Sequence, residues 1–247
     1  MGKLTAVAAA AVLAFGASAA QADIKIAVVG PMTGQYATFG AQMKAGAEQA
    51  VADINAKGGV MGEKLELLVG DDACDPKQAV AVANKMASSG VVLIAGHFCS
   101  GSSIPASKVY QDEGILQISP ASTNPKLTDE GGPNVFRVCG RDDQQGAVAG
   151  AFLAKHFKDK KIAITHDKTA YGKGLADSIA SAFEAKGGTI TELPDEAKKE
   201  WADSMPNIAQ NLAEDVEKRQ GYPAHKILSA YMDAMRAGGA KPMRDWD

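Results

Sequence analysis

The sequence has few aromatic residues and no excess of positive charge. Phe, Trp and Tyr supply only 6% of its 247 residues, and the formal net charge is −3. A protein that binds nucleic acid through the phosphate backbone needs a basic surface, so this balance argues against a nucleic-acid partner. Hydrophobic residues make up 46% of the chain, enough to bury a sizeable core in one large or two small domains.

Sequence motifs of several enzyme classes are also missing. The chain contains no Walker A loop, no G-x-G-x-x-G motif after an expected strand and no zinc-ligand spacing. His97, Cys99 and Ser100 lie close together and suggest a nucleophile and a base, but catalytic partners have to meet through the fold rather than along one strand end. We therefore expect no cofactor, no metal and no enzymatic activity, and we keep a small exported enzyme as an alternative.

The apolar run at the N-terminus is too short to span a membrane. Lys3 precedes a run of Ala, Val, Leu and Phe that ends near Ser18, and Ala20-Gln21-Ala22 places small residues where signal peptidase reads them. This pattern predicts a signal peptide over residues 1–22 that is cleaved before Asp23. The alternative is a buried N-terminal helix.

Cysteine is scarce, with only Cys74, Cys99 and Cys139 in the sequence. An exported protein enters an oxidising compartment where cysteines pair, and an odd number leaves at least one unpaired. No cysteine directly follows the predicted cleavage site, so a lipoprotein anchor is not expected.

Apolar runs and helical repeats alternate from residue 23 to residue 191. Strands are expected where short apolar runs are bounded by turn residues, and helices where apolar residues recur three and four positions apart. The expected strands are 23–29, 65–69, 91–95, 115–118, 135–138, 161–165 and one that begins at 189. The expected helices are 38–57, 76–86 (with Asp75 as N-cap), 102–112, 144–157 and 172–186. This alternation indicates a doubly wound α/β fold with parallel sheets and right-handed crossovers.

The loop 124–134 is rich in Pro, Gly and Asp and is the expected boundary between two lobes. The first lobe would cover residues 23–130, and a partial second lobe would cover residues 131–191. The remaining residues, 192–247, form a charged segment with three expected helices and no strand. The second lobe is therefore expected to be truncated and followed by an all-helical tail.

Four long strings of the sequence resemble one family of receptors. They are GPMTG at 30–34, GAEQAVADIN at 46–55, DDACDP at 71–76 and HDKTAYG at 166–172. In this order they closely resemble the leucine/isoleucine/valine-binding proteins, the branched-chain amino-acid receptors of ABC importers. The resemblance covers residues 22–191. It implies a monomeric type I periplasmic-binding-protein fold whose two lobes close over a free amino acid and present it to a membrane permease.

The resemblance also implies a binding site for the amino-acid backbone. Ser100 and Thr123 would bind the carboxylate, and a helix N-terminus at Ser100 suits an anion. The carbonyl of Ala121 and the carboxylate of Asp142 would face the ammonium group. The alternative is that the hydroxyls only cap helices or turns, and that Asp142 is a helix N-cap.

Apolar walls and a disulfide complete the site that the resemblance implies. Phe39 and Tyr171 would contact the ligand side chain, with ordinary core packing as the alternative. Cys74 and Cys99 would form the disulfide of the first lobe, leaving Cys139 as a free thiol.

The tail resembles a second family. LPDE at 193–196, MPNIA at 205–209, YMDAMR at 231–236 and RDWD at 244–247 are similar to the C-terminal helices of dicarboxylate receptors from TRAP transporters. This similarity implies a fusion of two receptor genes with a joint near Thr191. A divergent C-terminus of a single receptor is the alternative. A fused or truncated receptor without ligand-binding activity is a further alternative, because the first sheet would expose an edge.

Overall fold

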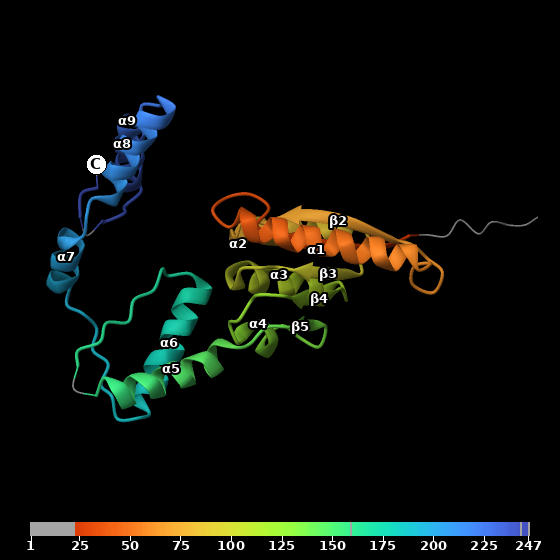
Figure 1. Cartoon of the computed structure of the whole chain (residues 1–247), viewed down its shortest axis with the longest axis horizontal. Helices are drawn as coiled ribbons and strands as arrows, with labels where there is room; N and C mark the ends of the chain where they lie inside the picture. The colour runs from red at the N-terminus through yellow and green to blue at the C-terminus, as the bar shows by residue number, and fades with distance from the viewer. Residues whose placement is uncertain (1–22, 159, 243, 247) are drawn as a thin grey trace, which may run out of the picture. The chain divides into compact units, whose positions relative to one another are not determined.

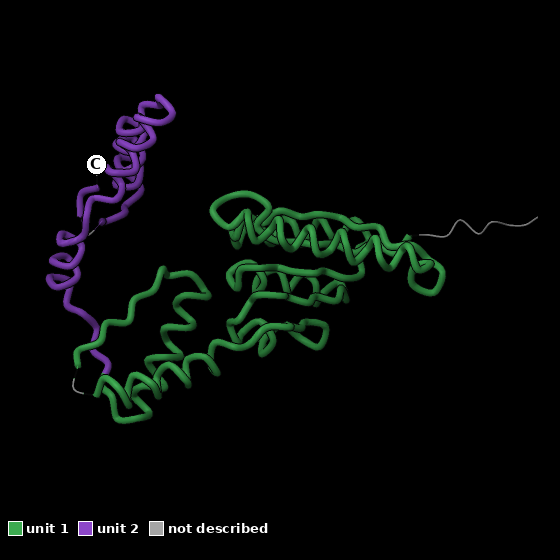
Figure 2. The backbone as a smooth tube through the Cα atoms, viewed as in Figure 1, with its two compact units in different colours: residues 1–189 green, residues 190–247 purple. Residues whose placement is uncertain are grey.

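The computed structural model describes residues 23–158, 160–242 and 244–246. The chain divides after Thr189 into two compact units, the second of which begins at Ile190 (Figure 2). The predicted signal peptide, residues 1–22, lies outside the described residues. Within the described part of the chain, no helix has the length and apolar character needed to cross a membrane.

A parallel sheet of five strands forms the centre of the first unit (Figure 1). The strands are β1 (Ile24–Gly30), β2 (Leu65–Asp71), β3 (Leu93–Gly96), β4 (Leu116–Ser119) and β5 (Val135–Arg137). Their order is β2-β1-β3-β4-β5, so the direction of the crossovers reverses between β1 and β3. In open α/β sheets a ligand binds outside the carboxyl ends of the strands at such a point.

Helices cover both faces of this sheet. They are α1 (Ala37–Ala56), α2 (Pro76–Ser88), α3 (Ser100–Asp112) and the short α4 (Lys126–Asp129). Right-handed crossovers place α1 on one face and α2 and α3 on the other. The main core lies on the α2 and α3 side. It consists of apolar side chains from β1, β3, these two helices and the segments that follow the helices: Ala27, Val29, Ala79, Ala83, Met86, Val91, Ile94, Ala106, Tyr110 and Ile115.

The strands expected between residues 23 and 138 form, with bounds that differ by one or two residues. Asp75 is the N-cap of α2, where its Oδ1 accepts a hydrogen bond of 2.7 Å from the Gln78 amide. The assignment of β5 to the second lobe was wrong, because Gln117, Ile118 and Ser119 of β4 pair with β5. The loop at 124–134 is no linker, since α4 lies within it.

The strands expected at 161–165 and from 189 onward are absent from the described residues. This part of the chain contributes two helices, α5 (Asp142–His156) and α6 (Ala170–Glu184), which pack against each other. An extended segment becomes a strand only when a neighbour accepts and donates its backbone hydrogen bonds. Because no second sheet forms in residues 23–158 or 160–189, the predicted two-sheet architecture is realised only in its first half.

The second unit contains three helices among its described residues: α7 (Asp195–Ser204), α8 (Ile208–Gln220) and α9 (Ala224–Ala237). Asn207 caps α8 by accepting a hydrogen bond of 3.1 Å from the Gln210 amide. Gly221 ends α8 in the left-handed conformation that favours glycine. Among its hydrophobic residues only Ala202, Ala213 and Met232 are buried in the described part of this unit. The helical tail that the sequence predicted is therefore present, with a small core.

Gly96 at the end of β3 provides a test of this packing. A Cβ atom at this position would lie 2.0 Å from the carbonyl oxygen of Val29, and the φ angle is +150°. We expect Gly96→Ala to lower the free energy of unfolding by about 2 kcal/mol or more, since both the backbone and the neighbouring strand oppose the methyl group. Urea unfolding monitored by circular dichroism measures this.

The matched control is Gly46→Ala in α1, where an added Cβ meets no atom within 4 Å. Alanine favours helix over glycine, so this variant should be unchanged or slightly more stable. Equal stability of the two variants would contradict the packing described for Gly96.

Candidate functional site

The carboxyl edge of the sheet brings together three of the six predicted ligand residues. Ser100 is the first residue of α3 and is 2% exposed. Its Oγ accepts a hydrogen bond of 3.3 Å from the amide of Asn124. The preceding residue, Thr123, accepts a hydrogen bond of 2.9 Å at its carbonyl from the amide of Asp142. The loop after β4 thus joins the N-terminus of α3 to the N-terminus of α5.

Two of these residues bury polar atoms that lack a partner. The hydroxyl of Thr123 and both carboxylate oxygens of Asp142 make no hydrogen bond of good geometry in the described structure, although the hydroxyl lies close enough to the carboxylate to lower its pKa. Asp142 is the first residue of α5, and its side chain caps nothing, so the N-cap alternative is wrong. A buried carboxylate without a partner is costly, and such a group is a candidate for binding a cation or a donor that arrives with a ligand.

The electrostatics of Asp142 follow from this burial. Burial raises the pKa of the carboxyl group, while the nearby Thr123 hydroxyl and the positive charge of Arg137 act in the opposite direction. The negative charge of Asp143 adds to the increase. Desolvation therefore outweighs the favourable neighbours of Asp142.

The predicted apolar walls lie outside the core. Phe39 on α1 is 44% exposed and stacks on Phe98 with ring centroids 4.7 Å apart. Tyr171, near the start of α6, is also 44% exposed. Ordinary core packing therefore describes neither aromatic side chain. Ala121 is half-buried in the loop after β4, where its amide donates to the Ser119 hydroxyl at 3.3 Å.

Three buried polar side chains, linked to each other by hydrogen bonds, support the candidate site. Nδ1 of His97 lies 2.6 Å from Oδ2 of Asp72, and Nε2 of His97 lies 2.9 Å from the hydroxyl oxygen of Tyr110. All three residues are fully buried. Burial, together with the negative charge of Asp72, raises the pKa of Tyr110. His97 is thus engaged in a structural network, and the arrangement of a base beside Ser100 that the enzyme alternative needs does not occur.

Buried serines hold the two loops of the site together. The carbonyl oxygen of His97 accepts hydrogen bonds from Ser119 Oγ at 2.6 Å and from Ser103 Oγ at 3.1 Å. Ser122 Oγ donates to the carbonyl of Phe98 at 2.9 Å. These bonds connect the loop after β3 with the loop after β4, which carry Ser100 and Thr123 respectively.

The predicted disulfide between Cys74 and Cys99 is present, with its Cα atoms 5.6 Å apart. Cys99 is the N-cap of α3, and the amide of Cys74 donates to Oδ1 of Asp72 at 2.9 Å. On a chain-entropy model, closing a loop of this length contributes roughly 3 kcal/mol. Cys139 is free and half-buried, and its thiol donates to the Ser122 carbonyl at 3.5 Å. Burial raises the pKa of this thiol.

Arg137 is a residue of the site that sequence reasoning missed. Its guanidinium donates to the carbonyl of Ser122 at 2.6 Å and to the carbonyl of Asn124 at 2.9 Å. It also donates to Thr128 Oγ1 at 2.8 Å. A single arginine at the end of β5 thus holds the loop that contains Thr123. The sequence signal was weak, because one arginine after a Pro- and Gly-rich loop has many ordinary explanations.

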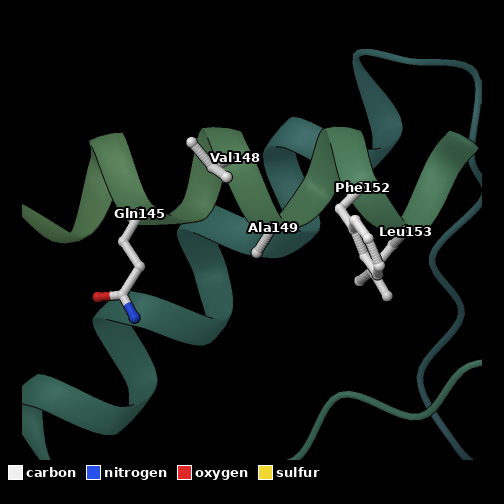
Figure 3. Close-up of a pocket in the computed structure, with 5 residues that line it drawn as sticks. All are labelled: Gln145, Val148, Ala149, Phe152 and Leu153. Carbon is white, nitrogen blue, oxygen red and sulfur yellow. The ribbon is translucent and has the colours of Figure 1, made fainter.

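Two surface depressions of the described structure are lined by residues other than these. One is lined by side chains of α5 alone, with Phe152 and Leu153 at one end and Gln145 at the other (Figure 3). A second lies between α5 and α6 and is lined by Asp143, Asp177, Ser178, Ser181, Ala182 and Ala185. Neither contains a predicted ligand residue. Both reflect a helix pair that no second sheet covers in the described chain.

A parallel sheet with reversed crossovers and a helix N-terminus at its carboxyl edge are features that α/β proteins with small-ligand sites share. The family model described as periplasmic binding protein matches residues 23–213. The chain belongs to this family and has its type I α/β fold.

The relatives include receptors for branched-chain amino acids. The Leu/Ile/Val-binding protein homolog 1 of Brucella melitensis is 56% identical over 206 residues, which cover 83% of this chain and 55% of that protein. The Leu/Ile/Val-binding protein of Escherichia coli is 44% identical over 229 residues, covering 93% of this chain and 62% of that protein. The chain therefore spans little more than half the length of these relatives.

A solved structure shows the same similarity. A leucine-binding protein from Thermotoga maritima superposes with a TM-score of 0.61 at 28% identity, covering 73% of this chain and 53% of that one. The match to the family continues to residue 213, beyond Thr191. The predicted change to a TRAP-type receptor at Thr191 is therefore not supported. Short strings on amphipathic helices are weakly specific, because polar and apolar residues recur at similar spacings in unrelated helices.

The raised pKa of Asp142 predicts how stability depends on pH. The folded state holds the Asp142 proton more tightly than the unfolded chain, so ionisation of this group costs stability as the pH rises above about 4. We expect Asp142→Asn to gain stability relative to the parent protein between about pH 4 and about pH 7. Urea unfolding at both pH values measures the difference.

Asp143→Asn is the matched control with the opposite sign. Hydrogen bonds from Arg141 lower the pKa of Asp143, so its ionised form stabilises the folded state above the ordinary pKa. This variant should lose stability relative to the parent mainly as the pH rises from about 2 to about 4, below the interval in which Asp142→Asn gains it. The same trend in both variants would contradict the described environment of Asp142.

Proposed function

We propose that this chain is the ligand-capturing part of a periplasmic receptor for branched-chain amino acids that serves an ABC importer. The observation that carries the proposal is the pair of unsatisfied side chains, Thr123 and Asp142, beside the N-terminus of α3. An amino acid brings a carboxylate and an ammonium group at a fixed separation. The site offers an anion-binding helix end and a buried anion next to each other.

The carboxylate of the ligand would lie at the N-terminus of α3. This end of the helix carries a positive partial charge and unsatisfied amide donors. Ser100 and Thr123 would add their hydroxyls, and the Thr123 hydroxyl has no partner among the residues described. The network of His97, Asp72 and Tyr110 holds this end of the helix in place without contacting the ligand.

The ammonium group would lie between the carbonyl of Ala121 and the carboxylate of Asp142. A cation at this position would replace the water that Asp142 lost on burial, and it would lower the carboxyl pKa towards its ordinary value. The energetic cost of the unpaired carboxylate would then be offset in the complex. Stability of the free protein would thus be lower than that of the complex at neutral pH.

The ligand side chain would contact the exposed rings of Phe39 and Tyr171, and movement of α5 and α6 relative to the sheet would cover it. The names of the Brucella and Escherichia coli relatives support leucine, isoleucine or valine as the ligand. We further propose that residues 1–22 direct export to the periplasm, and that the monomeric closed form is recognised by a membrane permease.

A second candidate is a receptor fragment without ligand-binding activity. The absence of a second sheet among the described residues favours it, as does the exposure of Val148 and Phe152 on α5, at 73% and 55%. A ligand held by one lobe would be poorly enclosed.

Thermal unfolding of residues 23–247 across a panel of free amino acids distinguishes the two candidates. Leucine at about 100 times its dissociation constant should add roughly 2.7 kcal/mol of stability and raise the melting temperature. A cooperative transition that no branched-chain amino acid shifts would support the second candidate and refute the first. Acetate and butylamine are suitable controls, since each carries only one of the two charged groups.

Removing both hydroxyls tests the carboxylate site. We expect Ser100→Ala combined with Thr123→Ala to weaken leucine binding by about a hundredfold or more, because each of the two hydrogen bonds to a charged group contributes about 1.5–3 kcal/mol. Isothermal titration calorimetry measures the affinity.

The matched control for the double variant is Ser107→Ala, further along α3. The hydroxyl of Ser107 donates within the helix to the Ile104 carbonyl at 2.7 Å. The affinity of the Ser107→Ala variant for leucine should equal that of the parent protein. Unchanged affinity in the double variant would show that the carboxylate binds elsewhere.

A further inference from the structure

Asn124 uses each of its polar groups in a hydrogen bond. Its amide donates to Ser100 Oγ at 3.3 Å, and its carbonyl accepts from Arg137 at 2.9 Å. Its side-chain Oδ1 accepts from the Lys126 amide at 3.0 Å, and its Nδ2 donates to the carbonyl of Ala170 at 2.7 Å. The residue is 6% exposed. It is therefore held by partners from four elements of the first unit: α3, α4, β5 and α6.

The bond to Ala170 connects parts of the unit that are far apart in sequence. Asn124 belongs to the loop after β4, while Ala170 is the first residue of α6. Small residues permit the close approach. A Cβ atom at Gly174 would lie 2.4 Å from Nδ2 of Asn124, and one at Gly101 would lie 3.9 Å from the Cβ of Ala170. A side chain at position 174 would displace the Asn124 amide group or α6 and so disturb the bond to Ala170.

We propose that Asn124 is a positioning residue in the closed receptor. Its hydrogen bond to Ala170, called the latch from here on, holds α6 against the loop after β4. The inference rests on the proposed function, because Thr123 and Tyr171, the neighbours of Asn124 and Ala170, are two of the residues assigned to the ligand. The latch holds Thr123, assigned to the carboxylate of the ligand, close to Tyr171, assigned to the side chain of the ligand. Ligand release then requires the bond between Asn124 and Ala170 to break.

The orientation of the amide group gives the latch its chemical specificity. The Lys126 amide donates to Oδ1 and so directs Nδ2 towards the Ala170 carbonyl. An aspartate at position 124 would keep the bond to Lys126 but place a second acceptor opposite the carbonyl of Ala170. Asn124→Asp should therefore weaken the latch more than Asn124→Ala, although it preserves the size of the side chain.

Hydrogen–deuterium exchange of the ligand-free full chain tests the latch directly. Backbone amides of residues 170–176 should exchange about threefold to tenfold faster in Asn124→Asp and in Gly174→Ala, as expected for the loss of one neutral hydrogen bond. Gly174→Ala leaves Asn124 itself intact and acts from the helix side. Gly46→Ala is the matched control, and its exchange in this segment should equal that of the parent. Parental exchange rates in both latch variants would overturn the proposal.

Stopped-flow measurement of leucine dissociation tests the role of the latch in binding. In both latch variants the dissociation rate should rise about threefold to tenfold, with an unchanged association rate. A parent protein that binds leucine while the variants release it at the parental rate would overturn the latch. Faster exchange of the variants in a chain that binds no leucine would support the latch and refute the receptor function.

Discussion

The carboxyl edge of the sheet depends on the buried contact between His97 and its two partners. Asp72 follows β2, His97 follows β3 and Tyr110 lies on α3, so one imidazole ring fixes three elements relative to each other. Asp72 extends this support to the disulfide through the amide of Cys74. Each member of the chain is fully buried, so removing one leaves an unsatisfied polar group in a medium of low dielectric. The stability of the fold and the geometry of the helix end at Ser100, where we propose that the ligand binds, thus depend on the same bonds.

The candidate site combines a well hydrogen-bonded scaffold with side chains that lack hydrogen-bond partners. Serine hydroxyls and the Arg137 guanidinium satisfy the backbone carbonyls of the loops after β3 and β4. The groups that would meet the ligand, Thr123 and Asp142, are instead left without partners in the described structure. A protein optimised for stability alone would pair or replace them. Unpaired buried groups beside a well-bonded scaffold are the arrangement expected where binding energy from a ligand completes the network.

The sequence predicts those parts of the fold that depend on residues close together in the chain. The strands from β1 to β4 and the cap at Asp75 follow from apolar runs and turn chemistry, whereas the disulfide and the ligand residues came only from family resemblance. The strand expected at 161–165 did not form, because a strand depends on partners that its own residues cannot supply. β5 was placed in the wrong lobe because its loop has the composition of a linker. The roles of His97 and Arg137 depend on contacts between distant residues and have no local signature.

All five strands of the sheet lie within one stretch of the sequence, from Ile24 to Arg137. All the bonds that orient the helix end at Ser100 are therefore encoded in one continuous stretch of the gene, together with the disulfide. Changes further downstream can alter how a proposed ligand is covered without disturbing the loops that would hold its carboxylate. In such an arrangement, the part of a receptor that follows Arg137 can be exchanged in evolution as one module, while the part from Ile24 to Arg137 is inherited unchanged.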